Sequence, residues 1–486
     1  MPQKPDHDVA IIGTGFSGLG MAIALLKEGR TSFVVLERAE DVGGTWRDNT
    51  YPGCACDIPS HLYSFSFEPK ADWSRMYPPQ PEIRAYLKGV AEKYGVMPFI
   101  RFGRTVAAMT WDAEGRFWRV QTADGQEVTA RIVASGMGGL SNPAWPKLKG
   151  IERFKGAQFH SAQWDHGYDL AGKRVAVIGT GASAIQFVPE IAPKAAQLHL
   201  FQRTPPWVVP KGDRPMRGWE QRLFKLLPFT QAWLRGAIYC GNEIRAPAFG
   251  KPEQLKKAQV LAKRYLDAAI AEEGLRASLT PNYVMGCKRI LISNDYYPTL
   301  TRDNVELVTD QVANVTETAI VTTDGRSREV DAIICGTGFA AMDPLYRVEV
   351  RGEGGRRLGD DWAHGAQAYL GLTVTGYPNL FFLMGPNTGL GHNSMVYMIE
   401  SQIRYVMDAL HLMERNGAGV MAVKAPAQAA FNTELQQKIA GSVWNSGGCK
   451  SWYLNAEGRN VSLWPGFTFT YRKKTRRVDG AAYELS

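Results

Sequence analysis

Long apolar runs are missing from this sequence of 486 residues. No stretch approaches the ~18 to 20 consecutive apolar residues that a membrane-spanning helix needs. The N-terminus also lacks the layout of a secretory signal peptide, because its first apolar run, Val9 to Ile12, leads directly into a glycine-rich turn. We therefore expect neither a membrane span nor a cleaved leader.

Cysteine is sparse as well, and its six residues are Cys54, Cys56, Cys240, Cys287, Cys335 and Cys449. Their spacing shows neither the paired pattern of a metal site nor a disulfide framework. Cys54 and Cys56 are one residue apart, which is weak ground for a metal ligand set. The pattern predicts no metal, no disulfide framework and a reducing, cytoplasmic location.

An acidic excess is absent, since 56 Lys and Arg residues outweigh 47 Asp and Glu and give a formal net charge of +9. The basic residues are scattered among acidic ones, except in the run from Arg472 to Arg477. A run that short is usually a solvated terminus, so we expect no nucleic-acid partner. The positive charge suits a site for phosphate-bearing ligands instead.

What the chain does contain is length, an ordinary globular composition and much glycine. Hydrophobic residues make up 45% and charged residues 21%, which is typical of folded proteins. The length exceeds one ordinary core, so two or three domains are expected. Fifty glycines fit a backbone that approaches bulky ligands closely.

Residues 8–37 read as a strand, a glycine-rich turn, a helix and a second strand. The turn, residues 13–18, is Gly-Thr-Gly-Phe-Ser-Gly, and an acidic residue ends the second strand. Such glycines permit a tight turn and a close pyrophosphate, while the terminal carboxylate accepts bonds from ribose hydroxyls. The predicted dinucleotide-binding residues here are Gly13, Gly15, Gly18, Glu37 and the adjacent Arg38.

Residues 174–203 repeat this pattern with the turn Gly-Thr-Gly-Ala-Ser-Ala. The second strand ends at Arg203 instead of an acid. Arginine can hold a 2′-phosphate through two bonds, so NADP is favoured over NAD. The predicted residues are Gly179, Thr180, Gly181, Ser183, Arg203 and Thr204. The alternatives are a loop that only caps a core helix and a surface cation at Arg203.

The two units end alike, each with an Asp-Gly hairpin before a buried strand, at residues 122–136 and 323–336. We predict an α/β fold with two Rossmann-like dinucleotide-binding domains and a helical insertion at 213–275. The FAD-binding domain is expected at 1–141 and 336–486, and the NADP-binding domain at 151–335. The proline-rich segment 142–150 is expected to link them. Two dinucleotides in one chain imply hydride transfer from nicotinamide to flavin.

The most specific motif contains Phe154, Gly156, His160 and Trp164, followed by Asp165. Its spacing resembles the fingerprint of the type I Baeyer–Villiger monooxygenases, a branch of the flavin-containing monooxygenases. The broader group usually ends this motif with a different aromatic residue, so Trp164 favours the Baeyer–Villiger branch.

The resemblance extends over almost the whole chain. Residues 43–46 (Gly-Gly-Thr-Trp) and 51–53 (Tyr-Pro-Gly) match a second family signature, and 384–389 and 464–466 look like parts of a returning FAD segment. The resemblance adds three residues to the cofactor-binding set: Gly44, Thr45 and Trp46.

The resemblance also implies a reaction. NADPH reduces FAD, dioxygen adds to the reduced flavin, and the resulting flavin peroxide attacks a ketone to give an ester or lactone. The family's active-site arginine follows a Gly-Cys-Lys sequence and corresponds here to Arg289. The aspartate that orients it follows the Tyr-Pro-Gly element and corresponds to Asp57. Lys288 would complete the phosphate clamp with Arg203 and Thr204.

Each assignment has a structural alternative. Lys288 and Arg289 could be a solvated basic pair, and Asp57 could be a turn residue or helix cap. Trp46 and Trp164 could be core aromatics. We interpret His160 as a residue that links domains, with no role in proton transfer.

Other functions share these motifs. A sulfide or amine oxygenase would use the same flavin peroxide, and a non-catalytic NADPH-sensing flavoprotein would keep both nucleotide sites. A disulfide reductase is rejected, because the only close pair, Cys54 and Cys56, is too tightly spaced. Residues 389–394 depart from the cyclohexanone-oxidising type, so the substrate stays open. The remaining expectations are a substrate pocket lined by the helical insertion and the returning loops, and a monomer or homodimer.

Overall fold

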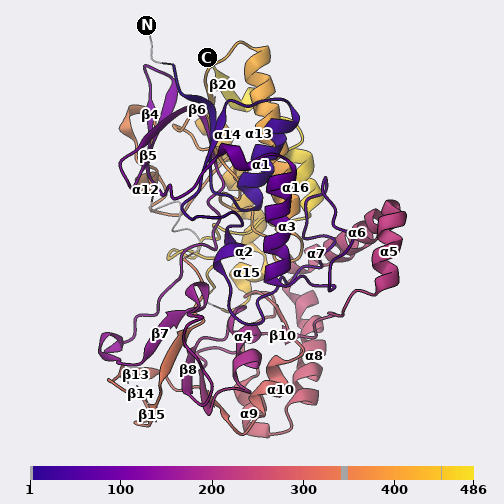
Figure 1. The fold of residues 1–486 in the computed structure, drawn as a ribbon, viewed down its shortest axis with the longest axis vertical. Coiled ribbons are helices and arrows are strands. Elements are labelled where there is room, and N and C mark those ends of the chain that lie inside the picture. Colours follow the sequence, from indigo (N-terminus) through magenta and orange to yellow (C-terminus); the bar gives the residue numbers. More distant parts are fainter. Residues whose placement is uncertain (1–3, 341–347, 450) are drawn as a thin grey trace.

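The computed structural model describes residues 4–340, 348–449 and 451–486. Figure 1 shows two lobes, one around each glycine-rich unit, with a helical projection between them. Within these residues, no helix is both long enough and apolar enough to cross a bilayer.

The first lobe is built on an eight-stranded sheet in the order β17-β4-β5-β6-β1-β2-β3, with β18 also paired to β6. Strands β6, β1, β2 and β3 run parallel, and β4, β5 and β6 form an antiparallel meander. The strands are β1 His7–Ile12, β2 Phe33–Leu36, β3 Ile100–Arg101, β4 Val106–Asp112, β5 Phe117–Thr122, β6 Glu127–Ser135, β17 Glu349–Arg351 and β18 Leu380–Phe382.

Helices α1 (Phe16–Lys27), α3 (Gln80–Lys93) and α13 (Met395–Arg415) pack together with the strands of this sheet into one apolar cluster. Because α13 and β18 come from the C-terminal part of the chain, the first lobe contains segments from both ends. The other helices of this part are α2 Thr45–Asp48, α12 Leu358–Asp361, α14 Ala425–Ala440, α15 Val443–Ser446 and α16 Thr468–Lys474.

The second lobe is built on a parallel five-stranded sheet in the order β12-β9-β8-β16-β7. Its central strands β8 and β16 are buried except for Arg174 at the start of β8, as expected for a parallel sheet covered on both faces. The elements are β7 Ala157–His160, β8 Arg174–Ile178, α4 Ala184–Ile191, β9 Gln197–Phe201, α10 Tyr296–Leu300, β12 Val305–Val308 and β16 Ala332–Cys335.

The helical insertion leaves the second lobe after β9. It contains α5 Gly218–Leu226, α6 Pro228–Glu243, α7 Ala246–Phe249, α8 Pro252–Ala269 and α9 Glu273–Ser278. Short strands complete the structure: β10 Val208–Val209, β11 Leu291–Ile292, β13 Val312–Val315, β14 Ala319–Thr322, β15 Ser327–Glu329, β19 Met421–Val423 and β20 Tyr483–Leu485.

The α/β class, the two repeated units, both Asp-Gly hairpins and the helical insertion are confirmed. The domain boundaries stay a prediction, and the range 336–486 includes 341–347 and 450, which lie outside the described residues. The interpretation of residues 472–477 as a solvated terminus is wrong in part. Residues 472–474 are the last turn of α16, and residues 475–477 form the turn that follows it. Thr475 is buried in that turn, and the chain continues to β20.

Candidate active site

The first glycine-rich turn joins β1 to α1, and neighbouring backbone leaves its glycines no room for side chains. A Cβ on Gly18 would lie 1.8 Å from the carbonyl oxygen of Gly13. A Cβ on Gly44 would lie 3.0 Å from the Cα of Gly15, and Gly44 has a φ of 53°. The turn and the segment at Gly44 therefore form one bare-backbone cradle, which fits the pyrophosphate of FAD.

Glu37 follows β2 and turns its carboxylate back into this turn. It accepts hydrogen bonds from the backbone N–H of Thr14 at 2.9 Å and from the Thr14 hydroxyl at 2.6 Å. Arg47 pairs with it at 2.8 Å, and only 3% of Glu37 is exposed. A buried, hydrogen-bonded carboxylate is thus fixed beside the cradle, at the position from which an acidic residue binds a ribose hydroxyl.

The other residues predicted for the first site surround the cradle. Arg38 is partly exposed and pairs with Asp48 at 2.8 Å. The Thr45 hydroxyl lies 3.5 Å from the carbonyl of Leu140. The indole N–H of Trp46 donates to the Tyr63 hydroxyl at 3.1 Å. The N–H of Gly43 donates to the carbonyl of Thr14 at 3.0 Å, which places the segment with Thr45 and Trp46 beside the first turn, and Arg38 follows Glu37 directly.

The second glycine-rich turn joins β8 to α4 and is closely packed at Gly179. A Cβ on Gly179, whose φ is 104°, would lie 2.7 Å from the carbonyl oxygen of Gly336. A Cβ on Gly181 would lie at an ordinary contact distance of 3.8 Å from the same oxygen, and Ser183 directly precedes α4. The Thr180 hydroxyl lies 3.4 Å from the carbonyl oxygen of Thr204. The turn therefore fits a second pyrophosphate at the start of α4.

Arg203 and Lys288 bring two positive charges to this end of the second lobe. Arg203 is exposed, and Lys288 is half-buried with its Nζ 5.1 Å from the centre of the Tyr283 ring. Burial lowers the pKa of Lys288, and the charge of Arg203 lowers it further. Two cations that repel each other across an open site suit an anionic group such as a 2′-phosphate.

Arg289 and Asp57 form an ion pair between the lobes. The Nε and Nη2 of Arg289 donate to Oδ2 of Asp57 at 3.0 and 2.5 Å. The side chains are 38% and 31% exposed, so the pair is accessible to a ligand. The charge of Asp57 raises the pKa of Arg289 above its ordinary value, so the guanidinium stays charged.

Two residues that the sequence did not single out support this pair. The amide of Gln186 on α4 bonds to the Tyr51 hydroxyl and to both backbone atoms of Ala55, at 3.0 to 3.3 Å. It thereby fastens the loop that carries Asp57 to the second lobe. Tyr453 faces the ion pair, and burial raises its pKa to about 12 against the opposing effect of Arg289. No motif marks either residue, because both act through tertiary contacts.

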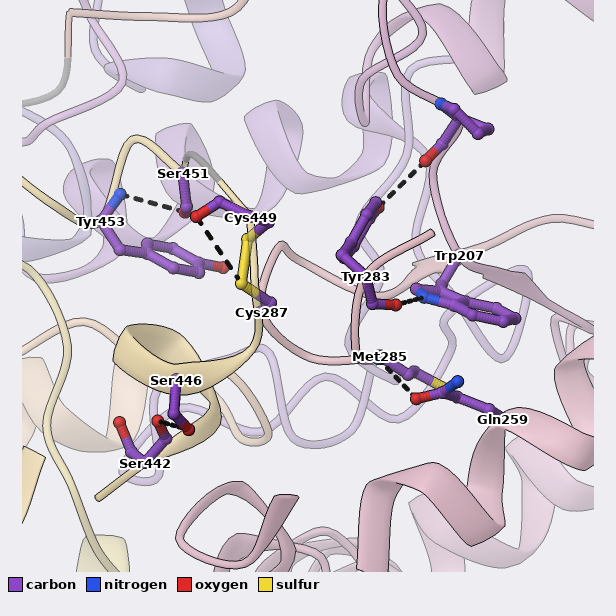
Figure 2. The surroundings of a disulfide bond; sticks show 11 residues. Trp207, Gln259, Tyr283, Met285, Cys287, Ser442, Ser446, Cys449, Ser451 and Tyr453 are labelled. Carbon is purple, nitrogen blue, oxygen red and sulfur yellow. Dashed lines mark hydrogen bonds between the residues drawn. A yellow bond between two sulfur atoms is a disulfide. The ribbon is translucent and has the colours of Figure 1, made fainter. Parts of the chain in front are cut away.

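Cys287 and Cys449 form a disulfide, with their Cα atoms 6.1 Å apart (Figure 2). The expectation of a chain without a disulfide framework is therefore wrong. The two cysteines are 162 residues apart, and only the fold brings them together. Cys54, Cys56, Cys240 and Cys335 are free, and no group of possible metal ligands occurs among the described residues.

The segment before Arg289 is held on both sides (Figure 2). The indole N–H of Trp207 donates to the carbonyl of Tyr283 at 2.9 Å, and the N–H of Met285 donates to Gln259 at 3.0 Å. The disulfide then ties Cys287 to the loop that leads to Tyr453. Arg289 thus follows a fixed segment.

The fingerprint residues belong to the second lobe, and His160 lies where this lobe meets the linking segments. A Cβ on Gly156 would lie 2.4 Å from the carbonyl oxygen of Asp331, and Phe154 is buried. Trp164 packs edge-on against Phe159. His160 ends β7, is fully buried and lies between Trp145 and Phe339, at ring distances of 5.7 and 6.1 Å.

Burial lowers the pKa of His160 to about 4, against the opposing effect of the Gly338 backbone. A neutral, buried imidazole among aromatic rings fits a structural residue at the junction. The role assigned to His160 nevertheless stays a prediction, as do the roles of the other site residues.

A pocket of about 140 Å³, partly open to solvent, lies between the insertion and the returning segment. Phe249 of α7 packs in the same apolar cluster as Cys287 and Tyr453, so the pocket adjoins the segment that precedes Arg289. Its lining is Ala246, Pro247, Phe249, Gly250, His392, Lys438, Ser442, Trp444, Trp464, Pro465, Gly466 and Phe467. The pocket thus lies between the parts of the chain where a substrate pocket was expected.

Comparison with known proteins agrees with this geometry. Residues 6–224 match the family model of flavin-binding monooxygenase-like proteins. The chain is 55% identical to a Baeyer–Villiger monooxygenase of Pseudomonas aeruginosa over 98% of its own length and 91% of the relative's. It is 50% identical to a Baeyer–Villiger monooxygenase of Streptomyces coelicolor, covering 98% and 92%.

Solved structures resemble the whole molecule. A steroid monooxygenase bound to NADP superposes with a TM-score of 0.89 at 32% identity, over 99% of both chains. A cyclohexanone monooxygenase from Rhodococcus bound to NADP⁺ gives a TM-score of 0.90 at 28% identity, over 100% of both chains.

Proposed function

This chain belongs to the Baeyer–Villiger monooxygenases, and we propose that Arg289 and Asp57 form the centre at which it inserts oxygen into a ketone. It is an NADPH-dependent flavoprotein monooxygenase. The observation that carries the proposal is the Arg289–Asp57 ion pair, accessible and set where the two dinucleotide-binding lobes meet. Family membership sets aside a non-catalytic NADPH sensor.

The two glycine-rich turns divide the cofactors between the lobes. Gly13, Gly15, Gly18, Gly44 and Glu37 would hold FAD, with Arg38, Thr45 and Trp46 around it. Gly179, Thr180, Gly181 and Ser183 would hold the NADP pyrophosphate, and Arg203, Thr204 and Lys288 the 2′-phosphate. When bound and reduced by NADPH, the flavin supplies the reactive oxygen that it takes from dioxygen.

Arg289 would stabilise the negative charge that develops on oxygen as the ketone is attacked. A guanidinium suits this task because it is planar, rich in donors and always charged. Asp57 takes up Nε and Nη2, so the remaining N–H donors can face the reacting oxygen. Asp57 thereby fixes the direction in which Arg289 donates.

The pocket beside α7 indicates an apolar substrate. Phe249, Trp444 and Trp464 line it, and a ketone with a hydrocarbon body would bury its apolar surface against these rings. The single polar group of a ketone would then find its donor outside the aromatic lining. This favours a hydrophobic ketone, either cyclic or linear, with the product an ester or lactone.

Two further points stay proposals. We expect a monomer or homodimer, and we expect a cytoplasmic location. Neither affects the assignment of the reaction.

The experiment is a product assay. The purified holoenzyme is incubated with NADPH, air and a panel of ketones and sulfides, and the products are identified by mass spectrometry. An ester or lactone from any ketone supports the proposal. Oxidation of sulfides alone would overturn it in favour of heteroatom oxygenation. Arg289→Lys is the matched variant, because it keeps the charge and loses the paired donors.

A further inference from the structure

Helices α5 and α6 form a hairpin that projects from the body of the molecule at the right of Figure 1. Half of the exposed large apolar side chains among the described residues lie on this hairpin or at its ends. They are Trp219, Leu226, Leu227, Phe229, Trp233 and Ile244, with exposed fractions of 59, 79, 44, 69, 75 and 78%. We call this set the hairpin face.

Helix α6 is oriented the opposite way from an ordinary surface helix, which buries its apolar side. Its inward side is polar: Gln231 donates to His61 at 3.1 Å and to the carbonyl of Lys70 at 2.7 Å. Arg235 donates to the carbonyl of His61 at 2.7 Å. The polar side chains therefore anchor the helix to the body, and Phe229 and Trp233 face water.

The inward polar side includes Glu243, near the end of α6. It is buried and accepts hydrogen bonds from Asn393 at 2.6 Å and from the Thr468 hydroxyl at 2.7 Å. Gln231, Arg235 and Glu243 are each hydrogen-bonded to other parts of this chain. The orientation of α6 is thus well determined, and the exposure of its apolar side follows from it.

The exposed charges that the hairpin segment itself carries have one sign. Between residues 214 and 251, all of which the structure describes, the carboxylates are Glu220 and Glu243, and both are buried. The exposed charges are Arg217, Arg222, Lys225, Arg245 and Lys251. Lys225 pairs with Asp72, which also pairs with Lys70. An apolar surface with a basic rim remains.

We propose that the hairpin face docks on the surface of a bilayer that contains anionic lipids. Tryptophan and phenylalanine enter the interfacial region of a bilayer, and lysine and arginine bind its anionic headgroups. The helices contain 9 and 16 residues, fewer than the roughly 20 needed to span. The hairpin would therefore lie in the interface and not cross it.

A second copy of this chain fits the face less well. A two-fold contact presents the same patch on both sides, so it would bring Arg217, Arg222 and Lys225 of one copy towards those of the other. Like charges in an apolar contact repel. An anionic membrane surface supplies the complementary sign.

Docking would also bring the pocket close to the membrane. Helix α6 continues directly into α7, whose Ala246, Pro247 and Phe249 line the pocket. Hydrophobic ketones partition into lipid, so an enzyme held at the interface would meet them at a higher concentration. This last step rests on the proposed function, whereas the docking does not.

The test is co-sedimentation of the holoenzyme with vesicles. One set is pure phosphatidylcholine, and the other is phosphatidylcholine mixed with phosphatidylglycerol. We expect at least about tenfold more bound protein on the anionic vesicles, with the difference lost at high salt. No binding to anionic vesicles, or equal binding to both sets, would overturn the proposal.

Two variants test whether vesicle binding depends on the hairpin face or on non-specific adsorption of exposed apolar side chains. F229S/W233S should lower binding to anionic vesicles by at least about tenfold, because each ring contributes apolar area to the interface. V260S/L261S is the matched control, since Val260 and Leu261 are exposed on α8, outside the face. Equal losses in both variants would contradict the assignment.

Two measurements keep these results interpretable. Melting temperature and NADPH oxidation in buffer should match the unmodified enzyme for both variants, because the substituted side chains are exposed. Sedimentation velocity without lipid distinguishes the rival occupant: a dimer that F229S/W233S dissociates would overturn lipid docking in favour of self-association.

Discussion

The two glycine-rich turns share a backbone design but differ in what stands at the end of the second strand. In the first lobe, Glu37 is buried, accepts two hydrogen bonds from Thr14 and pairs with Arg47. In the second lobe, Arg203 is exposed, and its positive charge lowers the pKa of the neighbouring Lys288.

This difference shows how one fold assigns two cofactors. A carboxylate locked into its own lobe presents a fixed acceptor for ribose and repels a phosphate. Two mutually repelling cations leave a region of positive potential that a phosphate can neutralise. The first site is thus built in advance by the chain, whereas the second would be completed by its ligand.

The largest expected effect distinguishes Glu37 from Arg203, the residues that follow the second strand in the two lobes. Glu37→Ala would remove the buried acceptor of Thr14 and one of the two carboxylates that pair with Arg47, the other being Asp48. Breaking a buried ion pair costs about 3–5 kcal/mol. We expect a lower free energy of unfolding in urea and loss of flavin during gel filtration. Arg203→Ala is the matched control and should unfold like the unmodified enzyme. Full retention of FAD and stability in Glu37→Ala would contradict a fixed acceptor.

The next effect concerns the ion pair that joins the lobes. Arg289→Ala should leave NADPH-driven flavin reduction intact and lower ester formation by about 10²–10³-fold, as when an oxyanion donor is removed. Stopped-flow absorbance gives the first rate, and product analysis the second. Ester formation at the unmodified rate would remove Arg289 from the centre.

The disulfide connects the second lobe to the returning segment, and its loss should cost about 2–4 kcal/mol of unfolding free energy. Cys287→Ser and Cys449→Ser should give equal losses, and the double variant no more than either. Cys240→Ser is the control, because Cys240 is exposed and free. If a reducing agent leaves the melting temperature of the unmodified enzyme unchanged, the link is absent in solution.

The smallest effect tests the second strand end directly. Arg203→Ala removes a charged contact worth about 1.5–3 kcal/mol, so KM for NADPH should rise roughly 10- to 100-fold. KM for NADH should stay the same, because NADH carries no 2′-phosphate. Equal changes for both cofactors would place Arg203 outside the phosphate site.

The sequence predicts the repeated units well because their signals are local. Gly18 is required by a backbone contact within its own turn, and Glu37 follows its strand directly. Each of these features appears within about 25 residues of chain. Periodicity and turn chemistry are sufficient to place them.

The rest of the site depends on contacts between distant segments. Cys287 and Cys449 are 162 residues apart. Gln186 bonds to a loop of the other lobe, and Tyr453 lies buried near the ion pair. Their spacing in the chain carries no trace of these contacts. Asp57 and Arg289 were found only through the resemblance, since physical signals alone favoured a turn residue and a solvated cation.

The ion pair between Asp57 and Arg289 bears on attempts to recombine relatives of this protein. Each lobe contributes one partner, and the hydrogen bonds of Gln186 in the second lobe hold the loop that carries Asp57 in position. A chimera that takes its lobes from two parents would keep both charged residues, but the contacts between its lobes would not match. The direction of the guanidinium therefore depends on the contacts between the lobes. An exchange of lobes should transfer all the residues that make these contacts together.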